Sequence, residues 1–351
     1  MKIRIAPLLM PAMAAILAAV SGLRALAAPS LPERLSETGL YVAGTLTVDP
    51  RNRPFSPQYP LWTDGARKQR WIQLPAGSRI TARDADTWEF PVGTRLWKEF
   101  AFDGRRVETR MLWRVSADAW AYASYAWNDA QTDATLVPAE GLADVAEVAP
   151  GKRHSVPSRD DCRACHDNGA SGVLGFSALQ LSTDRDPNAL HAEQASGVDL
   201  SDLIERGLLV GLPASFAPPR ITAASATARA ALGYLHGNCG HCHNERGPLS
   251  NVGLFLRQTP DAFSRAVATT FAHRMKKPAP GQSPDAVLRI EAGHPERSAL
   301  LQRIASRYPA LQMPPLGTAL VDEAAVELLR RWILEADATR DITPTEKGPR
   351  Q

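Results

Sequence analysis

The sequence predicts an α+β protein, in which an antiparallel, β-rich N-terminal domain is followed by a mainly α-helical domain. Its 351 residues exceed a typical single domain. Seven of the eight tryptophans lie between Trp62 and Trp127, whereas all four cysteines lie from Cys162 onward. The earlier part alternates short strand-forming runs with turn residues, and the later part shows helical spacing. We therefore expect a tryptophan-rich β domain at residues 35–150 and a helical domain at residues 151–338.

Short runs of strand-forming residues mark the first domain. Leu40–Val48 and Ala119–Trp127 are rich in aromatic and β-branched residues, which favour strands. Thr94–Phe102 and Arg105–Val115 flank Asp103-Gly104, a pair suited to a type I′ turn, and so predict a β-hairpin. Several short strands separated by turns are typical of an antiparallel sandwich or open barrel. We expect the tryptophans to fill its core; the alternative is a binding surface for a sugar, an aromatic compound or a partner protein.

Two segments of the second domain predict helices. Ser225–His236 is rich in alanine and leads directly into a cysteine-containing stretch. Asp322 is a good N-cap, and four apolar residues follow it at helical spacing. These residues are Val326, Leu329, Trp332 and Ile333. The tail at residues 339–351 is polar, and we expect it to be loose.

The segment at residues 1–27 has the pattern of a secretory signal peptide. Lys2 and Arg4 precede the apolar stretch Ile5–Val20, and Ala25-Leu26-Ala27 offers a small-x-small cleavage site. An uncleaved membrane anchor is the alternative, but the apolar run is short for a span and contains two prolines. We therefore expect export to the periplasm and no transmembrane segment in the mature chain.

Removing this segment also removes the excess positive charge. Its charged residues are Lys2, Arg4 and Arg24, so the formal net charge falls from +3 to zero. Such a mature chain gives no indication of a nucleic acid or an acidic membrane surface as its partner. No pair of acidic residues in the first domain has a pattern that indicates general acid–base catalysis, so we predict no catalytic residue.

All four cysteines lie in two pentapeptides with the pattern Cys-x-x-Cys-His, which is the attachment signature of c-type haem. We name Cys162–His166 the first motif and Cys239–His243 the second motif. Two thiols one helical turn apart can each add to a vinyl group of the porphyrin, and the adjacent histidine then ligates the iron. The sequence thus predicts two covalently bound haem c groups. The residues expected to bind them are Cys162, Cys165, His166, Cys239, Cys242 and His243.

A zinc site, a redox dithiol and coincidence are the competing interpretations of the two motifs. A zinc ribbon usually places its cysteine pairs about 15–20 residues apart. Cys165 and Cys239 are much farther apart in this chain. A thioredoxin-type dithiol is expected in a βαβ setting and does not need a following histidine. Export also favours haem, because c-type haem is attached on the far side of the bacterial inner membrane.

The second domain is therefore expected to be a cytochrome c-like dihaem body. Residues 151–218 contain the first motif, and residues 219–338 contain the second. The first of these segments is short for an independent cytochrome domain. We expect both haems to share one joined helical body.

Axial ligands determine what such haems can do. His166 and His243 are the expected proximal ligands. Met313 lies in Gln312–Pro315, a loop stiffened by proline before the terminal helix, and many c-type cytochromes present a distal methionine from a similar loop. We expect Met313 to ligate the second iron and to raise its reduction potential.

The sixth ligand of the first iron is open to several interpretations. No methionine lies between the two motifs. His191 is the preferred candidate, because it follows the first motif at a workable distance. His154, which precedes that motif, comes next. Met111, Met275 and an open site are the remaining alternatives.

Five further stretches accompany the two motifs. They are Tyr59–Ala66, Phe90–Thr94, Glu108–Arg110, Val156-Pro157 and Asn238–Asn244. In this combination the chain resembles a family of exported bacterial dihaem c-type cytochromes with a β-rich N-terminal region. The resemblance covers most of the mature chain. It implies electron transfer in the periplasm, and it carries no substrate over to this chain.

The favoured function is a periplasmic electron carrier that exchanges electrons with a redox protein or a respiratory-chain component. One alternative is a peroxidase-like dihaem oxidoreductase with an open first iron, although known dihaem peroxidases are all-helical. Another is a ligand-binding module whose haems relay the binding event. An open iron would favour the oxidoreductase, and a groove of exposed tryptophans would favour the binding module.

Overall fold

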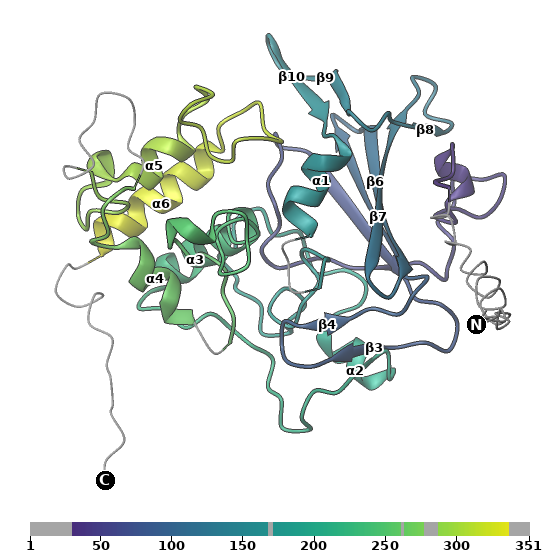
Figure 1. Ribbon diagram of the computed structural model, residues 1–351, viewed down its shortest axis with the longest axis horizontal. Helices are drawn as coiled ribbons and strands as arrows, with labels where there is room; N and C mark the ends of the chain where they lie inside the picture. The colour runs from purple at the N-terminus through teal and green to yellow at the C-terminus, as the bar shows by residue number, and fades with distance from the viewer. Residues whose placement is uncertain (1–29, 168–170, 261–262, 277–286, 337–351) are drawn as a thin grey trace, which may run out of the picture. The chain divides into compact units, whose positions relative to one another are not determined.

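The computed structural model describes residues 30–167, 171–260, 263–276 and 287–336 (Figure 1). The signal peptide expected at residues 1–27 and the tail expected at residues 339–351 lie outside the described residues. By their contacts, the residues from Leu31 onward form one compact unit. This unit combines antiparallel sheets with a few helices, which confirms the α+β class. Among the described helices, none is both long and apolar enough to cross a membrane.

A six-stranded antiparallel sheet is the largest β structure, with strand order β1-β2-β5-β6-β7-β8 (Figure 1). The expected hairpin is confirmed, and both residues of its Asp103-Gly104 turn have positive φ angles. The strand expected at Leu40–Val48 does not form, because a turn at Gly44 folds the segment back and an isolated bridge joins Tyr41 to Val48. The strands are β1 (Arg53–Pro54), β2 (Arg67–Gln73), β5 (Arg95–Phe102), β6 (Arg105–Ser116), β7 (Ala119–Trp127) and β8 (Ala134–Leu136).

Two smaller sheets connect the part of the chain before residue 150 with the part after it. The boundary expected at residue 150 falls in the turn of the antiparallel hairpin β9–β10. Strand β11 pairs in parallel with β3, so a late segment completes an early sheet. The strands are β9 (Leu142–Ala149), β10 (Lys152–Val156), β3 (Ile80–Ala82), β4 (Trp88–Glu89) and β11 (Leu209–Val210).

The helices lie mostly after residue 150, and the two longest were expected from the sequence. Ser225 caps α3 and Asp322 caps α6, each through a side-chain oxygen that accepts a backbone N–H. These two helices pack against each other around an apolar core. The α-helices are α1 (Arg159–His166), α2 (Leu200–Glu205), α3 (Ala226–Asn238), α4 (Phe263–Thr270), α5 (Ala299–Ile304) and α6 (Glu323–Glu335). Short 3₁₀ helices lie at Leu35–Glu37, Ser250–Val252 and Pro295–Arg297.

Both faces of the six-stranded sheet are covered, as its tryptophans suggested. One face packs Trp71, Trp97 and Met111 against the N-terminal segment. Part of the other face packs against Trp88 and Phe176. The seven tryptophans between Trp62 and Trp127 are all buried or half-buried. They serve as core residues, and none of the seven is an exposed aromatic surface residue.

Candidate functional site

The first motif forms the end of α1. Ser158 caps this helix: its hydroxyl oxygen accepts a hydrogen bond from the Asp161 N–H, and the Asp161 carboxylate accepts one from the Ser158 N–H, both at 3.0 Å. This capping box defines the start of the short helix, so the two thiols of the motif lie one turn apart. Tyr122 of β7 packs against the His166 ring, with 5.4 Å between the ring centroids. The motif is thereby held against the sheet.

The second motif follows α3 without a break. Cys239 is the C-cap of the helix, and the His243 N–H donates to the Cys239 carbonyl at 2.9 Å. Asn238 ties this end of α3 to the segment that precedes β2. Its side-chain oxygen accepts from the Trp62 N–H at 2.7 Å, and its side-chain nitrogen donates to the Pro60 carbonyl at 3.3 Å. The second motif therefore depends on a segment of the β-rich part for its position.

Both motifs line one pocket with a volume of about 250 Å³. The sheet, α1, the end of α3 and the loop after α5 all contribute to its walls. The residues predicted to attach haem and the predicted methionine ligand all reach this pocket. They are Cys162, Cys165, His166, Cys239, Cys242, His243 and Met313. Tertiary structure thus brings three distant segments of the sequence to one site.

The two motifs meet at their second cysteines. The sulfur atoms of Cys165 and Cys242 and a ring nitrogen of His241 all lie within 4.8 Å of one another. The hydrogen bond between the two thiols raises the pKa of Cys165 to about 12 and lowers the pKa of Cys242. Nothing in the sequence indicated His241, because it occupies a variable position of its motif.

The histidines that end the two motifs, His166 and His243, are neutral at physiological pH. Burial lowers the pKa of His166 and of His243 to about 4 in each case. The Nδ1 of His166 lies 2.9 Å from the Gly172 carbonyl oxygen, which can only accept, so Nδ1 carries the proton and Nε2 keeps a lone pair. A carbonyl partner of this kind orients metal-bound histidines in many proteins. The buried Nδ1 of His243 has no hydrogen-bond partner within the described part of the chain.

The loop that carries Met313 is held from several sides. The Met313 N–H donates to the Arg303 carbonyl at 3.0 Å. Farther along, the Ala319 and Leu320 N–H groups donate to Oδ1 of Asp64 at 2.7 and 2.9 Å. The half-buried methionine side chain lies at the pocket wall between these two anchors.

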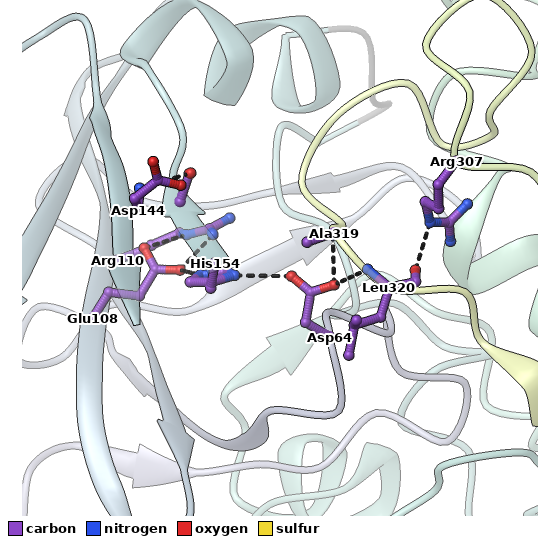
Figure 2. A network of polar contacts seen from close by, with 9 residues as sticks. Asp64, Glu108, Arg110, Asp144, His154, Arg307, Ala319 and Leu320 are labelled. Carbon is purple, nitrogen blue, oxygen red and sulfur yellow. Dashed lines mark hydrogen bonds and ion pairs between the residues drawn. The ribbon is translucent and has the colours of Figure 1, made fainter. Parts of the chain in front are cut away.

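A buried ionic network connects this loop to the sheet (Figure 2). His154 lies between two carboxylates, with Nδ1 3.1 Å from Asp64 Oδ2 and Nε2 3.1 Å from Glu108 Oε1. Glu108 also accepts two hydrogen bonds from Arg110, at 2.6 and 3.1 Å. Burial by itself lowers the pKa of His154, but the hydrogen bonds to both carboxylates raise it overall. Both ring nitrogens are therefore occupied, and His154 serves the network.

His191 is engaged with the N-terminus of α6. Its Nε2 is 2.8 Å from Oδ2 of Asp322, the N-cap of α6, and its ring is tilted against Trp62 with 6.4 Å between centroids. Trp62 lines the pocket, but His191 is not among the lining residues. Of the remaining candidates, Met111 is buried in the sheet and reaches the pocket, and Met275 lies outside it.

Three basic residues on neighbouring strands also line the pocket: Arg70, Lys98 and Arg110. The sequence analysis did not identify them as site residues. The alternation Leu96, Lys98, Phe100 shows which strand face Lys98 shares, but not that this face lies beside the motifs.

The chain matches no protein-family model, and no curated protein sequence or solved structure resembles it at a significant level. A functional assignment therefore depends on the residues of the pocket.

Proposed function

We propose that this protein is a periplasmic c-type cytochrome that carries two covalently bound haem c groups and transfers electrons between redox partners. One observation carries the proposal. Both Cys-x-x-Cys-His motifs and Met313 line a single pocket, although they come from three separate parts of the chain. A chance pair of motifs would have no reason to share a cavity with a methionine from a proline-rich loop.

The donor set of the pocket fits haem c. Each motif offers two thiols for thioether bonds and an imidazole for the iron. The low pKa values of His166 and His243 keep both imidazoles neutral, which metal ligation requires. The Gly172 carbonyl leaves Nε2 of His166 as the available donor atom.

When bound, each haem would supply reversible one-electron chemistry at its iron. Cys162 and Cys165 would hold one haem and Cys239 and Cys242 the other. Met313 would ligate the second iron, and its thioether would favour the reduced state. The apolar residues around the pocket would exclude water, and they would keep the potential high through a low local dielectric.

Haem stoichiometry tests the proposal directly. Protein exported to the periplasm of a host that attaches c-type haem should contain two haems per chain in a pyridine haemochrome assay. Cys239→Ser with Cys242→Ser should halve that ratio, and Cys162→Ser with Cys165→Ser is the matched variant for the other motif. One zinc per chain without haem would contradict the proposal. It would instead favour a metal ion held by Cys165, Cys242 and His241.

A peroxidase-like oxidoreductase is the second candidate function. Both histidines proposed as ligands of the first iron already have other partners, and this favours the second function. His191 contacts Asp322, and His154 contacts two carboxylates. In this arrangement neither side chain is free to close the sixth position, and His191 would first have to leave Asp322.

Electron paramagnetic resonance of the oxidised protein separates the two functions. An electron carrier with His191 on the first iron should show two low-spin signals, one of which turns high-spin in His191→Ala but not in His154→Ala. A high-spin signal in the unaltered protein, together with rapid cyanide binding, would identify an open iron. Peroxidase or related oxidoreductase activity would then be the function to assay.

A further inference from the structure

Arg70, Lys98 and Arg110 form a row across three adjacent strands of the sheet. Arg70 of β2 is the register partner of Lys98 of β5, and Lys98 is the register partner of Arg110 of β6. Directly opposed residues of neighbouring strands project from the same sheet face, and like charges at such positions repel each other. All three side chains line the pocket that holds the two motifs.

Two of the three basic residues, Arg70 and Lys98, are buried or half-buried without an ion-pair partner among the described residues. Arg70 is only 8% exposed, and Lys98 is half-buried. Arg110 has an ion-pair partner in Glu108, but in the described part of the chain no carboxylate forms an ion pair with Arg70 or Lys98. Burying an unpaired charge is costly. Burial, reinforced by the neighbouring cations, accordingly lowers the pKa of Lys98 well below its usual value.

Acidic residues near the row are already engaged. Glu108 lies between Arg110 and His154, and Asp161 of the pocket wall accepts hydrogen bonds from Ser158. Neither acid is paired with Arg70 or Lys98.

Glu193, whose charge acts on Arg70, accepts a hydrogen bond from the Lys68 N–H at 3.4 Å and forms no ion pair with Arg70. Lys98 lies over the Phe100 ring, with 4.8 Å between Nζ and the ring centroid. Because all three basic side chains line the pocket, an anion bound there would add counter-charge to the row.

We propose that Arg70, Lys98 and Arg110 are a carboxylate-binding site inside the pocket. Guanidinium and ammonium groups bind carboxylates through short, charge-assisted hydrogen bonds. Identifying the occupant depends on the proposed function: a haem carries carboxylate side chains, and a haem held in this pocket would bring them to its walls. A free carboxylate from solution is the other source of the same chemistry.

The test compares Lys98→Met and Arg70→Met with Arg67→Met. Arg67 lies on the same strand as Arg70 but projects from the opposite face and is exposed, so it is a matched control. Lys98→Arg keeps the charge and should behave like the unaltered protein, and circular dichroism would show that each variant is folded. Haem content, the reduction potentials and the affinity for succinate would be measured on every variant.

If haem carboxylates occupy the row, Lys98→Met and Arg70→Met should keep two haems but lower the potential of one of them. A nearby positive charge repels the oxidised iron more than the reduced iron. Removing that charge therefore favours oxidation and lowers the potential. If a free carboxylate is the ligand, succinate should bind the unaltered protein, and each variant should weaken binding by about tenfold or more. Arg67→Met should change neither the reduction potentials nor the affinity for succinate.

The outcomes separate this inference from the proposed function. Two haems per chain with unchanged potentials and no loss of succinate binding in Lys98→Met and Arg70→Met would overturn the carboxylate site while leaving the cytochrome intact. A protein without haem whose succinate binding depends on Lys98 would support the site and contradict the cytochrome.

Discussion

At the scale of single residues, His154 shows how neighbours decide the role of a side chain. The ring is 1% exposed and lies between Asp64 and Glu108. Burial by itself lowers its pKa, but the two hydrogen bonds raise the pKa above the ordinary value of 6.5. The charged ring is thus favoured in the folded chain. Its stabilising contribution is complete below pH 6.5 and is lost as the pH rises through the raised pKa.

Replacing His154 by Gln should therefore destabilise the protein in a pH-dependent way. Removing one partner of a buried ionic network costs about 3 kcal/mol in the free energy of unfolding. We expect a loss of this size below pH 6.5 and a smaller loss at higher pH. Urea unfolding of the unaltered protein and of His154→Gln, at pH values below and above 6.5, measures the difference in the free energy of unfolding. His294→Gln, at a side chain that is 49% exposed, should show little effect. If His154→Gln lost more stability at high pH than at low pH, the result would contradict a positively charged His154 in the folded protein.

Met313 carries the second prediction at this scale. If the protein is the dihaem cytochrome proposed above, Met313→Ala should abolish the weak charge-transfer band of the oxidised protein at the red end of the visible spectrum. It should also lower the potential of the second haem, because an alanine no longer favours the reduced iron. Absorption spectra and a redox titration check both effects. Met275→Ala, at a methionine outside the pocket, is the control, and an unchanged spectrum in Met313→Ala would assign the ligand elsewhere.

At the scale of elements, α3 has two glycines in 13 residues, a composition that weakens an isolated helix. The structure gives the reason. A methyl group on Gly233 would overlap the Tyr59 ring, and one on Gly237 would overlap the Tyr59 carbonyl. The helix can approach this segment because the side chains are missing, and the approach places Asn238 against Pro60 and Trp62.

Gly237→Ala should consequently destabilise the protein, although alanine is the better helix former. Overpacking of this kind costs about 1–3 kcal/mol, more than the helix propensity of alanine returns. Thermal unfolding measures the loss of stability. On the proposed function, the variant should also contain less haem at the second motif. Arg330→Ala on the exposed side of α6 is the matched control and should change stability little. A more stable Gly237→Ala variant would show that Tyr59 can move away.

At the scale of the whole molecule, the part before residue 150 and the part after it do not have separate structures. Strand β10 completes the hairpin with β9, and β11 completes the sheet with β3. Phe176, Leu181 and Leu203 pack in the same core as Ile72 and Leu96. The pocket itself has walls from both parts.

A chain that ends at residue 150 should therefore fail to fold cooperatively. It would expose the sheet face that Phe176 and Leu181 cover. It would also lack β10, the partner of β9, and β11, one of the two partners of β3. We expect poor amide dispersion in its NMR spectrum and no sharp urea transition, in contrast to the chain from Leu31 onward. A well-dispersed spectrum would establish residues 35–150 as an independent domain.

The sequence by itself determined features that depend on neighbouring residues. The Asp103-Gly104 hairpin follows from local turn geometry, and α3 and α6 follow from capping and helical spacing. The motifs could be recognised because attachment of c-type haem needs five consecutive residues. Leu40–Val48 failed as a strand for the opposite reason: strand propensity is weak where Gly44 can turn, and among the described strands none pairs with this segment.

Only the tertiary structure decided which side chains share the pocket. His154 meets Asp64 and Glu108 across 90 and 46 residues, and His191 meets Asp322 across 131 residues. Spacing along the chain has no information about such pairs, which depend on how sheets and helices pack. The same holds for the meeting of the two motifs and for the row of cations, because burial and strand register determine both.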